Sequence, residues 1–199
     1  MNIERRITYL EVGEVIRLVR GMSPLRDKLI ILLLYETGCS VTELINIKLK
    51  DIRNRSCEIV IESSVRSNEP RIAQVSKELL DTVKEYLLEK KKERSVASNY
   101  LLSTRQSRSM TQKRIQQILS EYKSKSGEKI TPQILRYTHI AHAYSKGVGV
   151  GEITRQVGLK RSRAIEIFSQ LKSKTNGYDR FFENGISADN ADGSGRHGR

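Results

Sequence analysis

The sequence predicts a mainly α-helical domain with one small antiparallel β-hairpin sheet, and three observations lead to this fold class. Apolar residues recur at helical spacing along most of the chain. Two short strand-like stretches, 57–61 and 71–75, flank a polar loop and suggest a hairpin. The order is helices, then the hairpin, then more helices, with no internal repeat. We therefore expect an α+β fold in which helices dominate.

The charge of the chain favours a polyanionic partner. Lys and Arg number 36 against 23 acidic residues, which gives a net charge of +13 and a pI near 9.9. Residues 175–199 contain three basic and four acidic side chains, so residues 1–174 carry a net charge of +14. Basic side chains attract phosphates whatever the nucleic-acid sequence. Composition alone also leaves open a soluble basic protein without such a partner.

Length and composition predict one domain over residues 1–174 and a C-terminal tail over residues 175–199. The tail is rich in Gly, Ser, Asn and Asp and lacks a periodic apolar face, so we expect it to be partly disordered. Cys39 and Cys57 form neither a CxxC pair nor a zinc pattern, so no metal or cofactor is expected. No apolar run is long enough to span a bilayer. A cytoplasmic protein is the expectation.

The first elements are predicted to be two helices. Residues 8–20 have Val12, Val15, Ile16 and Val19 at helical spacing. A second helix is expected to start with Ser23 as its cap and Pro24 in its first turn, and to end at Gly38. This helix is apolar nearly all round, which predicts a buried core helix.

Ser40 and Glu43 then have the spacing of a capping box, which predicts a short third helix. After the hairpin, Ser76 is expected to cap a long amphipathic helix that ends near Glu93. Residues 99–102 are interpreted as a further short strand.

Four helices are predicted for the remainder of the chain. Thr111 begins one of them, and Thr131-Pro132 begins the helix that contains Arg136. A shorter helix precedes Gly158, and the last runs from about Arg161 to Leu171.

Four short stretches form an ordered set of landmarks. They are Arg26-Asp27-Lys28-Leu29 with Leu33-Leu34-Tyr35-Glu36-Thr37-Gly38; Thr42-Glu43-Leu44 with Leu49-Lys50-Asp51-Ile52; Thr131-Pro132 with Leu135-Arg136 and Thr138; and Val157-Gly158 with Ile167-Phe168. In order and spacing they resemble the catalytic domain of the tyrosine recombinase (phage integrase) family, over about residues 7–171. The resemblance therefore implies the catalytic-domain fold of that family.

The resemblance also implies a chemistry that needs particular residue types. In this family a Tyr hydroxyl attacks a DNA phosphate and forms a covalent phosphotyrosine, without metal or ATP. Two Arg side chains bind the non-bridging oxygens, because a planar guanidinium fork matches phosphate. A Lys on the hairpin protonates the leaving oxygen, and two His (or His and Trp) assist.

The resemblance carries over six family positions to this chain. In chain order these are Ser40 (first Arg), Arg66 (hairpin Lys), Gln133 (first His), Arg136 (second Arg), Leu159 (second His) and Phe168 (nucleophile). Only Arg136 keeps the residue type of the family. Ser40 is better explained as a helix cap, and Phe168 fills the space of the ring but lacks the attacking oxygen.

We therefore expect a family member that binds double-stranded DNA and does not cleave it. The residues expected to contact DNA are Arg136, Arg66, Gln133, Lys160, Arg161 and Arg163. The family's usual separate N-terminal DNA-binding domain is expected to be absent. Further copies of the chain, or an active recombinase, are possible partners through the C-terminal segment.

Two alternatives stay open at the level of sequence. Tyr178, ten residues after Phe168, could act as the nucleophile in cis or in trans, which would make the chain an active recombinase or integrase. Residues 152–168 also fit a helix-turn-helix motif, with Gly158 in the turn and basic residues after it, which would indicate a transcriptional regulator.

Three further residues near Arg136 have open or ordinary interpretations. His139 and His142 lack a third ligand of suitable spacing, so they are interpreted as structural histidines. Tyr137 could contact a phosphate through its hydroxyl, or it could belong to the core.

Overall fold

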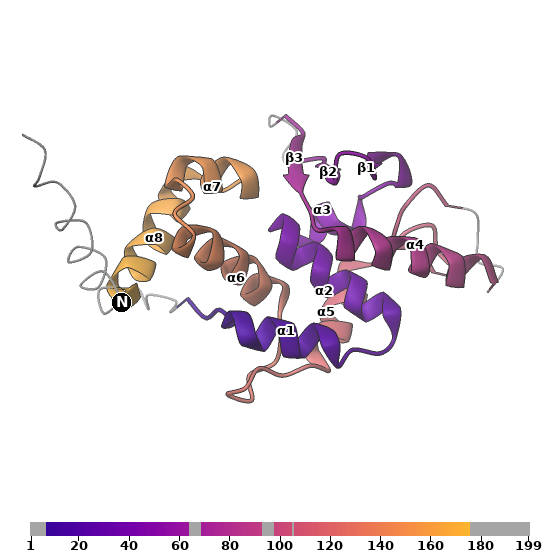
Figure 1. Ribbon diagram of the computed structural model, residues 1–199, viewed down its shortest axis with the longest axis horizontal. Coiled ribbons are helices and arrows are strands. Elements are labelled where there is room, and N and C mark those ends of the chain that lie inside the picture. The colour runs from indigo at the N-terminus through magenta and orange to yellow at the C-terminus, as the bar shows by residue number, and fades with distance from the viewer. Residues whose placement is uncertain (1–6, 64–68, 93–97, 105, 176–199) are drawn as a thin grey trace, which may run out of the picture.

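The computed structural model describes residues 7–63, 69–92, 98–104 and 106–175. Helices and strands follow one another in the order shown in Figure 1. They are α1 (Val12–Arg20), α2 (Leu25–Thr37), α3 (Val41–Ile45), the 3-10 turn η1 (Leu49–Asp51), β1 (Ile52–Arg53), β2 (Glu58–Ile61), β3 (Arg71–Gln74), α4 (Lys77–Lys92), α5 (Gln112–Ser120), α6 (Pro132–Ser145), α7 (Val150–Val157) and α8 (Arg161–Thr175). The predicted mainly helical α+β class is confirmed.

The sheet is antiparallel and has the strand order β1-β2-β3. The predicted hairpin is formed by β2 and β3, with Ile59 opposite Ala73. Sequence analysis missed β1, a two-residue strand that pairs Ile52 with Ile59. The strand predicted over residues 99–102 is wrong, because this stretch makes only an isolated bridge between Lys48 and Tyr100. Residues 176–199 of the predicted tail and the tip of the hairpin lie outside the described residues, while Thr175, the first residue of the predicted tail, ends α8.

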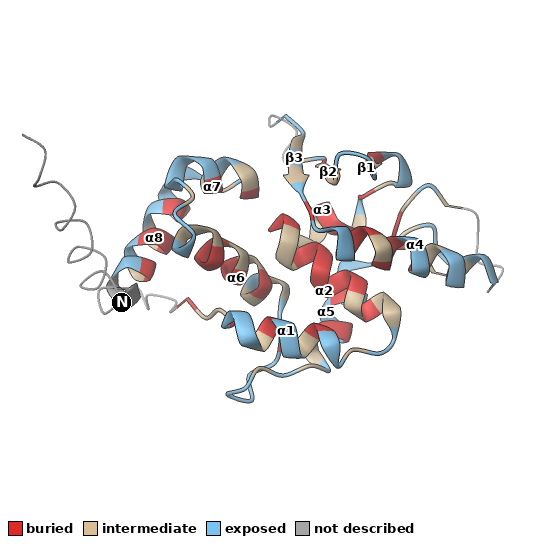
Figure 2. Ribbon diagram, viewed as in Figure 1, coloured by how far each residue is buried: buried red, intermediate tan, exposed pale blue. Residues whose placement is uncertain are grey.

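Two hydrophobic clusters divide the domain. The larger one surrounds α2, in which residues 29–34 are all buried, so the prediction of a buried core helix is confirmed. In Figure 2 most of α2 is red (buried), whereas α1 and α4 also include pale blue, exposed segments. The sheet, α4 and α5 pack around the same cluster, which places the start of α3 at its edge.

The second cluster joins α6, α7 and α8. Its fully buried aliphatic side chains include Ile140, Ile153, Val157 and Ile167, and Ile7 at the other end of the chain packs with them. Because Leu135 belongs to the first cluster and Tyr137 to the second, α6 connects the two. The family positions are therefore contributed from both sides of this junction.

The first helix is shorter than predicted. It begins at Val12, and residues 7–11, here called the N-terminal strap, run extended ahead of it. The Leu10 amide donates to Thr138 Oγ1 at 3.0 Å, and the Ile7 amide donates to Gln170 Oε1 at 2.9 Å. Because these amides bond across to α6 and α8, the strap does not form the first turn of a helix.

Most of the predicted helix boundaries depend on caps that the structure shows. The side chains of Thr111 and Thr131 accept bonds from the backbone at the starts of α5 and α6. Gly38 and Gly158 have left-handed conformations at the ends of α2 and α7, with φ of 59° and 64°. The start of α2 is the exception, because Pro24 itself is the cap residue and Ser23 is not.

In the part of the chain that the structure describes, no helix combines the length and the apolar character needed to cross a membrane.

Candidate functional site

A cavity of about 1100 Å³ lies where α3, α5, α6 and the start of α8 meet, and it is here called the central cavity. Four of the six family positions line it: Ser40, Gln133, Arg136 and Leu159. Arg66 lies outside the described residues. Phe168 does not line the central cavity. The two hydrophobic clusters thus bring most of the predicted site residues to one place, although they lie up to 119 positions apart in the chain.

Arg136 forms the floor of the central cavity. Its side chain is 13% exposed, and one guanidinium nitrogen donates to the carbonyl of Val157 at the end of α7. Another nitrogen, Nη1, lies 3.9 Å from Glu43 Oε2. Burial lowers the pKa of Arg136, Glu43 raises it, and Arg71 lowers it again. The side chain stays charged, since the guanidinium of an arginine is effectively always protonated in proteins.

Glu43 is the centre of the charged network behind this floor. Its two oxygens accept hydrogen bonds from Arg71 Nη1 and Nη2 at 2.8 and 2.9 Å, and Oε2 also accepts from the Ser40 amide at 2.8 Å. Burial by itself would raise the pKa of Glu43, but the hydrogen bonds from Arg71 and Ser40 leave it below its ordinary value. One carboxylate therefore faces two guanidinium groups, and the network keeps a net positive charge.

Sequence analysis did not identify Arg71 as part of the site. Its side chain is 11% exposed and is placed by β3, in which Arg71 and Ala73 face inward while Ile72 is exposed. Side chains alternate between the two faces of β3, but an Arg on the inner face and an Ile on the outer face reverse the usual placement of apolar residues. The residue order alone does not show which face of a strand is buried, so no sequence signal indicated this ion pair.

Ser40 acts as the cap of α3. Its Oγ accepts from the Glu43 amide at 3.3 Å, and the Glu43 carboxylate accepts in turn from the Ser40 backbone N–H at 2.8 Å. The predicted capping box is confirmed. The residue at the first Arg position, Ser40, therefore has a local structural role as a helix cap.

Arg163 enters the central cavity from the first turn of α8. It donates to the hydroxyl of Tyr137 and lies over the Tyr137 ring, with its guanidinium carbon 5.7 Å from the ring centroid. A second nitrogen, Nη1, lies 2.5 Å from Glu166 Oε2. Tyr137 is 7% exposed and lines the same cavity. Of the two interpretations of Tyr137, the structure thus shows a ring packed in the core whose hydroxyl reaches the site.

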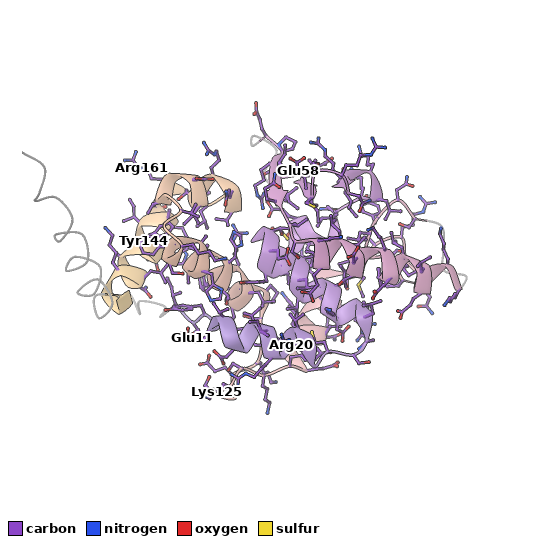
Figure 3. The ribbon with its side chains drawn as sticks, in the orientation of Figure 1. Glu11, Arg20, Glu58, Lys125, Tyr144 and Arg161 are labelled. Atoms are coloured by element: carbon purple, nitrogen blue, oxygen red, sulfur yellow. The ribbon has the colours of Figure 1, made fainter. Side chains whose placement is uncertain are left out.

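The other two predicted basic residues of this segment are not directed at the central cavity. Arg161 lines a separate apolar groove between α7 and α8, here called the α7–α8 groove, and Lys160 is exposed at the turn before α8. In Figure 3 Arg161 lies on the side of α7 and α8 that is turned away from α2 and α3. The basic cluster is therefore divided between two surfaces.

Phe168 also belongs to the α7–α8 groove. The residue is 4% exposed, and its ring centroid lies 5.4 Å from that of Tyr144 on α6. Tyr178, the alternative nucleophile, lies outside the described residues. Cys39 is the thiol at the central cavity, and burial raises its pKa to about 11, so it stays protonated near neutral pH.

Both histidines of α6 bond to backbone carbonyls. His139 Nδ1 donates to the Tyr35 carbonyl at 2.8 Å, and His142 Nε2 donates to the Leu10 carbonyl at 2.9 Å. His142 Nδ1 then accepts from the Tyr35 hydroxyl at 3.0 Å. Burial lowers the pKa of both imidazoles. Across the described ranges, no group of three or more His, Cys, Asp or Glu side chains is arranged to hold a metal ion.

Comparison with known proteins gives a consistent result. The model of the "Phage integrase family" matches residues 5–174. The chain is 29% identical over 176 residues to tyrosine recombinase XerA of Pyrococcus furiosus, covering 87% of this chain and 59% of that protein. It is 30% identical over 168 residues to XerA of Pyrococcus horikoshii, covering 83% and 57%. The chain thus spans less than two thirds of the length of these curated relatives.

Solved structures with the same fold include two recombinases. The crystal structure of XerA recombinase aligns with a TM-score of 0.72 at 22% identity, over 86% of this chain and 65% of that one. The post-cleavage complex of XerH recombinase with a palindromic difH substrate aligns with a TM-score of 0.71 at 17% identity, over 90% and 54%. At these identities the likeness shows the fold.

Proposed function

The chain belongs to the phage integrase family of tyrosine recombinases, and on this premise we propose that it binds double-stranded DNA without cleaving it. One observation carries the proposal. Arg136, the family's phosphate-binding residue, lines a positively charged cavity, while Ser40, Leu159 and Phe168 stand at positions that strand cleavage needs.

Charge and the character of the relatives support the DNA-binding half. Two buried guanidinium groups share one carboxylate, so the floor of the central cavity favours an anion. A DNA phosphate is the anion that the family relationship indicates, and XerH was solved on its difH substrate. Gln133 at the rim of the cavity, together with Arg66, Lys160, Arg161 and Arg163, remains a candidate for further contacts.

The residues present at the reactive positions support the second half. Phe168 has no hydroxyl, and its ring packs in the α7–α8 groove. Leu159 cannot transfer a proton, and Ser40 is too short and too well bonded to replace a guanidinium. Loss of a single oxyanion contact typically costs about 3–4 kcal/mol, and groups that act together fail non-additively. We infer that the standard covalent route is closed.

Two further parts of the proposal concern organisation. Residues 1–174 form the DNA-binding domain, and residues 175–199 are a tail that contacts a second copy or an active recombinase. A cytoplasmic location follows from binding to chromosomal or mobile-element DNA.

The helix-turn-helix alternative receives less support. Residues 150–175 do form two helices around a left-handed Gly158, as that motif requires. However, the hairpin lies beside these helices, because the side chain of Arg71 on β3 lies close to Gly158. A Cβ atom added to Gly158 would be 3.6 Å from Arg71 Nη1. An integrase-family domain needs that neighbour, and an independent regulator motif does not.

Titration of a fluorescent 30-base-pair duplex at several salt concentrations tests DNA binding. We expect affinity to fall as salt rises, by about 0.9 in log K per log salt for each phosphate contacted. Arg136→Gln should weaken binding about 10–100-fold, because charged hydrogen bonds contribute about 1.5–3 kcal/mol each. Arg20→Gln is the matched control, because Arg20 is exposed on α1 (Figure 3) and should bind as the wild type does. Absence of binding at low salt, or binding indifferent to salt, would contradict the proposal.

A further inference from the structure

We propose that Arg163, positioned by Tyr137, supplies the second phosphate-binding guanidinium of the central cavity. In this chain it takes over the task of the first family Arg, whose position is Ser40. The inference rests on the proposed DNA binding and specifies which side chains hold the phosphate at its centre.

The first step is placement. Arg136 and Tyr137 are consecutive on α6, and Arg163 reaches the same cavity from α8, so two guanidinium groups line it from two helices. A pair of guanidinium groups can bind a single phosphate from two sides, because each offers a planar set of donors. Ser40, which also lines the cavity, contributes no positive charge.

The second step is orientation. The Tyr137 hydroxyl accepts a hydrogen bond from Arg163, and its ring lies beneath the guanidinium. Because Tyr137 is buried in the second hydrophobic cluster, both contacts come from a fixed support. A long, flexible side chain is thereby held near one position, which reduces the conformational entropy that it loses when it binds a ligand.

The third step is availability, and Arg71 provides the contrast. Arg71 gives both terminal nitrogens to the buried Glu43 and does not line the central cavity. Arg163 is 33% exposed, and its acidic partner Glu166 is 41% exposed. Exposed ion pairs are worth about 0–1 kcal/mol, so a DNA phosphate can compete with Glu166 for Arg163. A guanidinium also has more donors than Tyr137 and Glu166 use.

Duplex titrations of a small set of variants test the inference. We expect Arg163→Gln to weaken binding about 10-fold or more and Glu166→Gln to strengthen it about 2- to 5-fold, because the competing carboxylate is lost. Tyr137→Phe should weaken binding a few-fold, since the ring face remains while the hydroxyl is lost. Arg155→Gln is the matched control, an exposed Arg on α7 that should bind as the wild type does.

Double variants separate positioning from a direct role. Tyr137→Phe should have no further effect in the Arg163→Gln background, because Tyr137 acts through Arg163. If Arg136 and Arg163 hold one phosphate, each single variant still contacts that phosphate and keeps the wild-type slope of log K against log salt concentration. In the double variant the contact is lost, so the magnitude of this slope should fall by about 0.9. Circular dichroism melts of every variant confirm that the fold is kept.

The outcomes distinguish the two proposals. Failure of the wild type to bind duplex would overturn DNA binding and this inference together. Normal binding by Arg163→Gln, with a wild-type protein that does bind, would overturn this inference alone. So would an effect of Tyr137→Phe that persists without Arg163, or a loss of about 0.9 in slope for each single variant.

Discussion

The two sets of charged residues at the central cavity are held in different ways. Arg136 at its floor, and Glu43 and Arg71 behind it, have side chains that are 5–13% exposed. Glu43 accepts a hydrogen bond from the Ser40 backbone N–H, and Arg136 donates one to the Val157 carbonyl. Arg163 and Glu166 lie at its edge with side chains 33% and 41% exposed. The buried set therefore fixes the scaffold, whereas the more exposed Arg163 is the side chain that we propose exchanges its carboxylate for a phosphate. We further propose that the groups needed for strand cleavage are absent from this scaffold.

The largest expected effect is on the buried set. Glu43→Ala leaves two buried guanidinium groups without their carboxylate. The free energy of unfolding, measured with urea, should therefore fall by about 3–5 kcal/mol. Asp81→Ala, which removes the 48% exposed partner of Lys84, should change the free energy of unfolding little. Equal and small effects of both variants would show that the buried network does not fix the scaffold.

The contact between the two clusters at Gly38 gives the next largest effect. A Cβ there would lie 2.7 Å from His139 Cδ2 and from Val157 Cγ1, in addition to the cost of a φ of +59°. Gly127 has a φ of +85°, and an added Cβ there would meet no atom within 4 Å, so Gly127→Ala should lower the free energy of unfolding by about 1–2 kcal/mol through backbone strain alone. Gly38→Ala should lower it by about 1–3 kcal/mol more, because the added methyl group overpacks the contact with His139 and Val157. Similar chemical-denaturation midpoints for the two variants would argue against close contact between α2, α6 and α7.

Acid should destabilise the domain through the two histidines of α6. Burial lowers the pKa of His139 and of His142, so the unfolded chain binds protons first as the pH falls below about 6.5. The free energy of unfolding should therefore decrease from pH 7 to pH 5, at up to about 1.4 kcal/mol per pH unit for each titrating histidine. Urea midpoints at three pH values measure this slope, and His142→Gln should reduce it. Stability that increases over this range would contradict the expected sign.

The smallest effect concerns the first Arg position. Ser40→Ala removes a helix cap and should lower stability by about 1 kcal/mol. Thr111→Ala removes the corresponding cap of α5, away from the residues that line the central cavity, and provides the matched control. If Ser40→Ala also abolished duplex binding while Thr111→Ala did not, Ser40 would have a direct role at the cavity, which a purely capping role excludes.

Sequence alone predicted the features that depend on neighbouring residues. Caps such as Ser40 and Thr131, and the left-handed Gly38, follow from backbone groups a few positions away. The partners of Arg71 and Arg163 were not predictable in the same way, because Glu43 lies 28 positions from the first and Tyr137 lies 26 from the second. Tertiary packing decides such pairs.

The N-terminal strap and Phe168 show the same limit. Apolar spacing favoured a helix from residue 8, but backbone N–H groups of the strap donate hydrogen bonds to the side chains of Thr138 and Gln170. These hydrogen bonds keep the strap out of the helix. The sequence placed Phe168 at the nucleophile position, and packing against Tyr144 directs its ring to the α7–α8 groove. The position of Phe168 in the family pattern could be predicted from its neighbours in sequence. The orientation of its ring depends on packing in the second cluster, which only the fold shows.

The central claim is that the chain holds a DNA phosphate without attacking it. Incubating the protein with a nicked duplex that it binds, followed by denaturing electrophoresis and mass spectrometry, tests this claim most directly. The account predicts that all of the protein runs at its unmodified mass, for the wild type and for Tyr178→Phe and Tyr137→Phe alike. A protein–DNA adduct that survives denaturation and disappears in either Tyr→Phe variant would contradict it.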